Sequence, residues 1–120
     1  MPFKKYNELD IWKKAFRFGL ECINLSKAIP KNSANYILSN QIIRSATSIA
    51  GNIAEGSGAS SKRDFINYLN IARKSAIESE NWLKFINQTN RISQATKARL
   101  LNEAEEIIKI LTTIIKNSKK

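Results

Sequence analysis

Two short acidic groups are the first candidates for a metal site or for proton transfer. The first contains Glu78 and Glu80, which would point about 200° apart on a helix and so could not chelate one ion together. In the second group, Glu103 and Glu106 share one helix face, but basic residues lie on that face as well. A solvated network of charges is therefore the interpretation that we favour over a metal site.

Histidine is absent from all 120 residues. Its absence removes the commonest general base, the usual catalytic triads and most zinc sites. It also removes the Glu-x-x-His pairs by which helical bundles hold two metal ions. The single cysteine, Cys22, lies in an apolar stripe, which indicates a small core residue. We expect no catalytic residue, no metal and no cofactor, and we predict that the protein is not an enzyme.

A glycine- and serine-rich segment, residues 56–61, comes directly before Lys62 and Arg63. Backbone amides at the start of a helix, together with two cations, could hold a phosphate. The segment is no Walker loop, because it lacks a preceding strand and a Gly-Lys-Ser/Thr end. We favour the alternative in which Gly56 is a left-handed C-cap and a serine caps the next helix.

Basic residues outnumber acidic ones by 20 to 10, which gives a net charge of +10 and a pI near 10.0. Nucleic acid is the first partner that such a surface suggests, and a merely solubilising charge is the alternative. No aromatic residues are interleaved with the cations, so binding would be directed to the backbone and would depend strongly on salt. The candidate nucleic-acid-binding residues are Lys13, Lys14, Arg17, Arg44, Lys62, Arg63, Arg73 and Lys74.

The elements that must position these residues are four amphipathic helices. Apolar residues recur at helical spacing, for example Ile42, Ala46, Ile49 and Ile53, and no strand pattern occurs. Short loops between long helices predict an all-α, up-down-up-down antiparallel four-helix bundle, with residues 1–120 as one domain. We expect the helices at about 8–28, 34–55, 61–87 and 94–117, with N-caps at Asn7, at Asn32 or Ser33, at Ser60 or Ser61, and at Ser93.

The third predicted helix has a strict heptad alternation that implies packing at a shallow angle. Its members are Phe65, Leu69, Ala72, Ala76, Ser79, Leu83 and Ile86. The central stretch, residues 39–58, is low in charge and rich in small side chains. The neutral polar face of this stretch is expected to approach another backbone closely or to contact a polar partner.

The first predicted helix is apolar over more than half of its circumference. A bundle helix needs an apolar arc of only about 100° or slightly more, so the excess predicts a contact with another subunit. On the third helix, two isoleucines lie close to an outward line of basic residues and are candidates for a second interface. The predicted interface residues are Ile11, Ala15, Phe18, Ile66 and Ile77.

The chain has no apolar run of about 18 residues, so we predict that it does not span a membrane. Its first residues, Met-Pro-Phe-Lys-Lys-Tyr-Asn-Glu, have no apolar region after the lysines and do not resemble a signal peptide. We therefore expect a cytoplasmic protein.

Four segments resemble a known family. They are Leu9-Asp-Ile-Trp-Lys-Lys-Ala15, Gln41-Ile-Ile-Arg-Ser-Ala46, Ser48-Ile-Ala-Gly-Asn-Ile-Ala-Glu-Gly-Ser-Gly58 and Ser61-Lys-Arg-Asp-Phe-Ile-Asn-Tyr-Leu69. They are similar to the four-helix bundle proteins encoded in intervening sequences of bacterial large-subunit ribosomal RNA genes. The resemblance implies a homopentameric barrel of bundles. It also implies kinship with the accessory variability determinant of diversity-generating retroelements, a basic pentamer that binds nucleic acid and reverse transcriptase.

The chain departs from the family pattern at two places. Ile43 stands beside Arg44 where the family usually has a second basic residue, and Ala59 and Ser60 stand where it often has arginines. Both departures weaken the basic patch that would bind RNA. The first hypothesis remains a non-enzymatic homo-oligomer that binds RNA or DNA backbone. The second is a protein-interaction scaffold whose charge serves solubility, with itself or another protein as partner.

Overall fold

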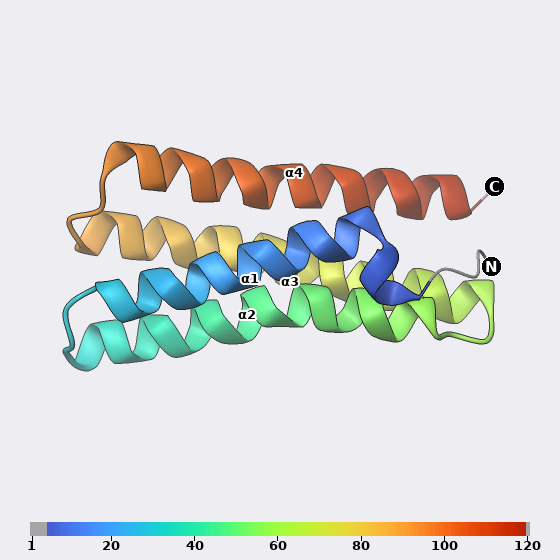
Figure 1. Cartoon of the computed structure of the whole chain (residues 1–120), viewed down its shortest axis with the longest axis horizontal. Helices are drawn as coiled ribbons and strands as arrows, with labels where there is room; N and C mark the ends of the chain where they lie inside the picture. The colour runs from blue at the N-terminus through green and yellow to red at the C-terminus, as the bar shows by residue number, and fades with distance from the viewer. Residues whose placement is uncertain (1–4, 120) are drawn as a thin grey trace.

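Four long helices run antiparallel to one another in the computed structural model, which describes residues 5–119 (Figure 1). After a short 3-10 turn at Tyr6–Glu8, they are α1 Asp10–Ala28, α2 Ser33–Ser57, α3 Lys62–Thr89 and α4 Gln94–Ser118. Each helix packs against the next one in the chain, and α4 closes the bundle against α1. Within the described residues, α1 makes no packing contact with α3, nor α2 with α4, so these pairs lie on the diagonals. The predicted all-α antiparallel bundle is confirmed.

The core runs along the bundle axis and is built from apolar positions at helical spacing. On α3, the predicted heptad series begins at the partly buried Phe65 and continues through buried residues to Ile86. On α2, Ile42, Ala46 and Ile49 are all fully buried. Side chains three and four residues apart lie on one face of a helix, so this spacing alone directs each helix toward the axis.

Serine hydroxyl groups join α2 to α3 along the most extensive helix pair of the bundle. Ser79 Oγ donates to Ser45 Oγ at 2.9 Å, and Ser75 Oγ donates to Ser48 Oγ at 3.0 Å. The small size of these residues lets the two helices approach, and the hydrogen bonds satisfy hydroxyls that are largely buried. On the predicted polar face of residues 39–58, Ser48 thus contacts a serine side chain of α3, whereas Asn40 and Arg44 are exposed.

Gly56 is not the left-handed C-cap that the sequence predicted. The helix α2 continues through Ser57 and ends at Gly58, whose φ is −93°, and no glycine within residues 5–119 has a positive φ. Gly56 is buried against α3, where an added Cβ would lie 3.1 Å from Cβ of Tyr68. Close approach of the two helices, rather than backbone conformation, explains this glycine.

Three N-caps lie where they were predicted. The side chain of Asn32 accepts from the backbone N–H of Asn35, and that of Ser61 from the backbone N–H of Asp64. Ser93 caps α4 in the same way. These bonds satisfy amides that have no partner inside the helix, so each fixes where a helix begins.

The start of α1 differs from the prediction. Asn7 lies in the 3-10 turn and does not cap the helix, which begins at Asp10 after Leu9 without a side-chain cap. The turn is held by Glu8, whose carboxylate accepts from the backbone N–H of Lys5 at 3.0 Å. It also places the ring of Tyr6 edge-on to the ring of Trp12, with 5.2 Å between centroids.

The bundle measures 45 × 21 × 20 Å. Both hairpin connections, α1–α2 and α3–α4, lie at one end, and the α2–α3 connection lies at the other (Figure 1). The predicted domain range also includes residues 1–4 and 120, which lie outside the described residues. None of the described helices is long and apolar enough to cross a membrane.

Candidate nucleic-acid interface

The eight predicted nucleic-acid-binding residues do not form one patch. Three of them lie on α1, one on α2 and four on α3. Because α1 and α3 lie on a diagonal of the bundle, their outward faces point away from each other. The cations on these two helices therefore cannot contact one short stretch of backbone together.

Lys14 is largely neutralised within the bundle. Its ammonium group lies 3.0 Å from the carboxylate of Glu103 and 2.6 Å from that of Glu106, and only 16% of its side chain is exposed. A second ion pair, between Arg99 and Glu21 at 2.8 Å, also joins α4 to α1. The acidic group on α4 is thus a charge network, as predicted, and Lys14 holds two helices together rather than facing a ligand.

The ion pairs of Lys14 shift the pKa of both partners. Burial by itself would lower the pKa of Lys14, but the hydrogen bonds and charges of Glu106 and Glu103 outweigh it and raise this pKa. The hydrogen bond from Lys14, and then its charge, lower the pKa of Glu106. Each group is therefore held in its charged form.

Two further predicted residues are engaged on the bundle surface. The guanidinium of Arg44 donates to Gln41 at 2.9 Å and to the carboxylate of Glu78 at 3.1 Å. Nε of Arg73 donates to the hydroxyl of Thr112 at 2.8 Å. Both residues link neighbouring helices, α2 to α3 and α3 to α4. The charge of Arg44 stays accessible, since 59% of its side chain is exposed.

The remaining predicted cations are solvent-facing. Lys13 and Arg17 are exposed on α1, and Arg63 and Lys74 are exposed on α3. None of these four forms an ion pair with another described residue. Lys62 is exposed at the start of α3.

The glycine- and serine-rich segment before α3 has the hydrogen bonds of helix caps. Ser57 donates to the carbonyl of Ala54 at 2.8 Å, and the N–H of Gly58 donates to the carbonyl of Glu55 at 3.2 Å. Ser61 accepts from Asp64, whose carboxylate lies in the first turn of α3. The serine cap of the favoured interpretation is therefore present at Ser61, whereas the C-cap is Gly58 and not Gly56.

The predicted subunit interface requires a correction. Ala15 and Phe18 are fully buried within the bundle, so they are core residues and cannot contact another bundle. Ile11 and Ile66 are partly buried against the core, whereas Ile77 is 42% exposed. The apolar circumference of α1 consists of two stripes, one with Trp12 and Phe16 and one with Ala15 and Phe18. The prediction placed the second stripe at a subunit contact, but it faces the core.

The other stripe of α1 carries the exposed apolar surface. The rings of Trp12 and Phe16 stack with 4.8 Å between centroids, and Phe16 and Leu20 are each 45% exposed. A small groove of about 180 Å³ lies beside them, between α1 and α2. Its floor on the α2 side is made by Thr47 and Ala50. We call this surface the α1–α2 apolar face.

A basic surface that sequence reasoning missed lies at the end of the bundle with the two hairpin connections. Residues 22–54 and 81–102 contain no aspartate or glutamate. The cations at this end come from both connections and from the adjacent helix ends. They are Lys27, Lys31, Lys84, Arg91 and Lys97, which we call the basic end. None of them forms an ion pair with any other residue in the described range.

A pair of asparagines holds the two connections together. Asn35 Nδ2 donates to Asn90 Oδ1 at 2.9 Å, and Asn90 Nδ2 donates to Asn35 Oδ1 at 3.0 Å. Asn35 Nδ2 also donates to the carbonyl of Pro30 at 2.8 Å, and Asn35 is only 5% exposed. Cations from sequence-distant loops therefore share one rigid surface. The signal in the sequence was the spacing of acidic residues, which leaves two long acid-free runs.

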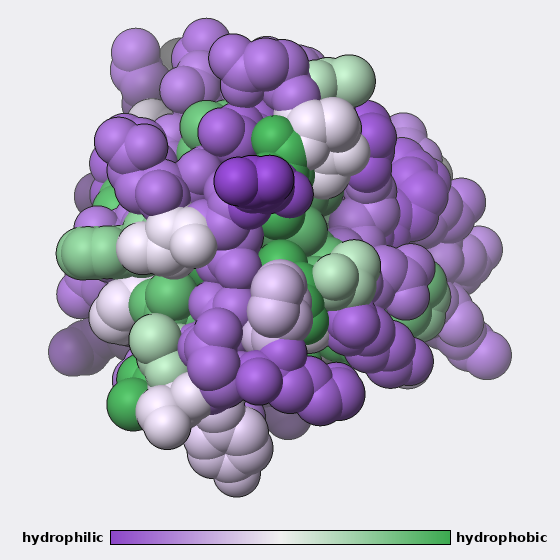
Figure 2. Space-filling view, turned by 90° about the vertical axis from the view of Figure 1, so that its left-hand side faces the viewer, coloured by the Kyte–Doolittle hydropathy of each residue, from purple (hydrophilic) through white to green (hydrophobic). Residues whose placement is uncertain are grey.

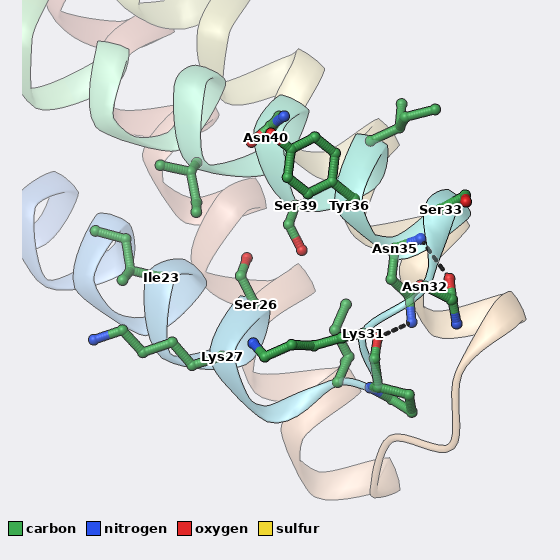
Figure 3. Close-up of a pocket in the computed structure, with 14 residues that line it drawn as sticks. Ile23, Ser26, Lys27, Lys31, Asn32, Ser33, Asn35, Tyr36, Ser39 and Asn40 are labelled. Carbon is green, nitrogen blue, oxygen red and sulfur yellow. Dashed lines mark hydrogen bonds between the residues drawn. The ribbon is translucent and has the colours of Figure 1, made fainter.

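Two hollows flank this surface. The larger, about 720 Å³, lies between the end of α1 and the start of α2 and includes Lys27 and Lys31 (Figure 3). The smaller, about 580 Å³, lies between the end of α3 and the start of α4 and includes Lys84 and Lys97. Seen end-on, hydrophilic residues cover most of this end and hydrophobic ones show in a strip between them (Figure 2).

Other chemistry finds little support. Within residues 5–119, no group of three or more acidic, histidine or cysteine side chains could hold a metal ion. Cys22 is fully buried, and burial raises the pKa of its thiol to about 12. Such a thiol is almost entirely protonated at neutral pH and is a poor nucleophile.

Comparisons with known proteins fit this fold. One similar structure is a crystal structure at 1.70 Å of a protein of unknown function from the S23 ribosomal protein family, from Bacteroides thetaiotaomicron VPI-5482. The sequence of that protein is 40% identical to this chain. The match covers 88% of this chain and 98% of that one, with a TM-score of 0.82. No curated protein matches. Residues 7–113 match the profile of the 23S rRNA-intervening sequence proteins, and the chain belongs to that family.

Proposed function

We propose that this protein is a non-enzymatic, cytoplasmic homo-oligomer that binds the backbone of RNA or DNA. The basic end carries the proposal, because it gathers five cations from two connections and the adjacent helix ends, and none of them forms an ion pair with another described residue. Positive charge that is not held in an ion pair attracts phosphate and raises the rate of encounter with a polyanion. The name of the family, which refers to 23S rRNA, is consistent with RNA as that polyanion.

The expected binding is strong at low salt and weak in sequence preference. Each phosphate that a cation neutralises releases counterions, so log K falls with log salt by about 0.7 per contact for single strands and about 0.9 for duplex DNA. Five contacts at the basic end would therefore give a slope of about −3.5 for single strands and about −4.5 for duplex DNA. Exposed side-chain cations such as Lys13, Arg17, Arg63 and Lys74 would add weaker contacts along the sides.

Charge reversal toward the two ends of the bundle tests the location of binding. Lys84→Glu with Lys97→Glu changes the basic end, and Lys109→Glu with Lys116→Glu makes the same change in charge toward the opposite end. Affinity for a generic RNA duplex and a single strand is measured by fluorescence anisotropy at two salt concentrations. The first variant should lose most of the affinity and much of the salt slope, and the second should lose little. Arg44→Glu should have an intermediate effect.

The absence of binding by the unaltered protein at low salt would overturn the proposal. Equal losses in the two charge-reversed variants would also overturn it as a statement about the basic end, because net charge alone would then explain binding.

Self-association is the second part of the proposal, and the α1–α2 apolar face supports it. Phe16 and Leu20 expose apolar area that another copy could cover. Gly51 lies on the outer side of α2, one turn after Thr47, and a Cβ added there would meet nothing within 4 Å. A glycine inside a helix costs about 0.5–1 kcal/mol relative to alanine, and the isolated bundle gains no contact from it. A second bundle approaching closely would use that space, and the resemblance noted from the sequence implies five copies.

A protein-interaction scaffold is the alternative function, and a specific observation favours it. Ile71 and Phe85 are 46% and 52% exposed on α3, away from the α1–α2 apolar face. Copies of the bundle that meet through α1 and α2 would leave this second apolar surface for a different protein. Light scattering that shows an oligomer, combined with no nucleic-acid binding at low salt, would favour the scaffold.

A further inference from the structure

We infer that the larger hollow at the basic end binds one unpaired nucleotide of a single-stranded nucleic acid. The base would enter between the end of α1 and the start of α2, and its phosphates would lie at Lys27 and Lys31 (Figure 3). This inference rests on the proposed function, because it concerns the same nucleic acid. It adds that the base, and not only the backbone, is recognised.

The size and position of the hollow suit a small planar ligand. Its volume of about 720 Å³ is within the range of about 300–1,000 Å³ that is usual for small-molecule sites. It opens to solvent beside the α1–α2 connection, which the Asn35–Asn90 pair holds in place. A pre-formed site loses less entropy on binding than one that must be ordered by its ligand.

The lining has the groups that a base requires. Ile23 and Ile43 form apolar walls, and the ring of Tyr36, which is 71% exposed, offers a flat face with no aromatic partner within the described residues. Bases stack on such rings with little dependence on sequence. The side chains of Ser39 and Asn40 lie beside this ring and form no hydrogen bond with any described residue. They can therefore bond the edge of a base.

Charge selects an anionic ligand over a neutral one. The hollow includes no acidic side chain, and the acid-free run 22–54 contains its whole lining. Lys27 and Lys31 lie along one edge of the hollow, apart from the Tyr36 ring (Figure 3). A ligand with a flat apolar part and a phosphate a few bonds away would satisfy both regions. An acidic peptide would satisfy the lysines but would leave the ring and the isoleucines without a matched partner.

The affinities for two single strands of equal charge, one with bases and one without, distinguish this inference from the proposed function. The probes are a fluorescent DNA strand that contains 2-aminopurine, an abasic strand of the same length, and poly-glutamate as a competitor. The base-containing strand should bind about tenfold more tightly than the abasic strand, because one base stack is worth roughly that factor. Its 2-aminopurine fluorescence should fall on binding, and poly-glutamate should displace the abasic strand at a lower concentration than the base-containing strand.

Substitutions at two exposed aromatic residues locate the effect. Tyr36→Ala should bring the affinity for the base-containing strand down to that of the abasic strand, and Tyr36→Phe should restore the difference. Phe85→Ala, at an exposed ring on α3 outside the hollow, is the control and should change neither affinity. Because Tyr36 is largely exposed, circular dichroism should show an intact helical fold in each variant.

Equal affinity for the two strands would overturn the nucleotide site while leaving the proposed function in place. Failure of both strands to bind at low salt would overturn both. A loss on Phe85→Ala equal to that on Tyr36→Ala would contradict a base in this hollow. Displacement of both strands by the same concentration of poly-glutamate would contradict it as well.

Discussion

Asn35 and Asn90 exchange two hydrogen bonds across the end of the bundle, at 2.9 and 3.0 Å, although 55 positions separate them in the chain. One asparagine follows the cap of α2 and the other ends α3. The pair links the two connections around which the cations of the basic end are gathered.

Loss of the amide of Asn90 should destabilise the bundle. Asn90→Ala leaves the buried amide of Asn35 with unsatisfied groups, which costs about 1–3 kcal/mol, and should lower Tm accordingly. Asn81→Ala, at an exposed α3 position whose side chain bonds no other described residue, should change the free energy of unfolding by less than about 0.5 kcal/mol. Thermal and urea unfolding followed by circular dichroism measure both. Equal small effects would show that the pair contributes no stability.

Alanine at two glycines of α2 should have opposite effects. Gly51→Ala should stabilise the separated bundle by about 0.5–1 kcal/mol, since it meets nothing, but should weaken self-association if another copy packs there. Gly56→Ala should destabilise the bundle, because its Cβ would crowd Cβ of Tyr68 at 3.1 Å. Urea unfolding at low concentration and light scattering at high concentration separate the two properties. Unchanged assembly of Gly51→Ala would remove this glycine from the subunit contact.

The contact between α1 and α4 should weaken at both extremes of pH. The pKa of Glu106 is lowered from 4.5 by Lys14, so the stability that this pair provides is present above pH 4.5 and is lost as pH falls through the lowered value. The pKa of Lys14 is raised from 10.5, so its contribution is fully present below pH 10.5 and is lost as pH rises through the raised value.

Comparison with Lys14→Met isolates this contribution from that of the other carboxylates. The free energy of unfolding of the unaltered protein should fall more steeply than that of the variant below pH 4.5 and above pH 10.5. Parallel curves for the two proteins at every pH would contradict the assignment of these shifts to the Lys14 pairs.

The sequence was sufficient for the fold because the decisive signals are local. Ser61 and Ser93 begin helices through bonds to amides three residues away, and the α3 series from Phe65 to Ile86 fixes a buried face by spacing alone. The error at Phe18 has a different origin. Periodicity shows that α1 has two apolar stripes, but which one faces the axis depends on where α2 and α4 pack.

The candidate site was harder to predict because it depends on loops that are distant in the chain. The sequence indicated that Lys14 and Arg44 could bind nucleic acid. In the fold, carboxylates from other helices, Glu106 and Glu78, form ion pairs with them. Lys27 and Arg91 are far apart in the sequence, and only the antiparallel fold places both at one end of the bundle (Figure 1). Ion pairing and clustering are tertiary properties, and only the acid-free runs of residues were visible beforehand.

Cys22 is the single cysteine of the chain and is fully buried on the core side of α1. The reaction of its thiol with a labelling reagent therefore reports local opening of the bundle. A labelling reagent can reach it only in molecules where α1 has swung outward, because the thiolate is both hidden and scarce in the closed form. The rate of labelling thus depends on how often α1 opens. A second copy packed against α1 would lower the labelling rate. The labelling rate of Cys22 can therefore measure both the opening of one bundle and its association with another.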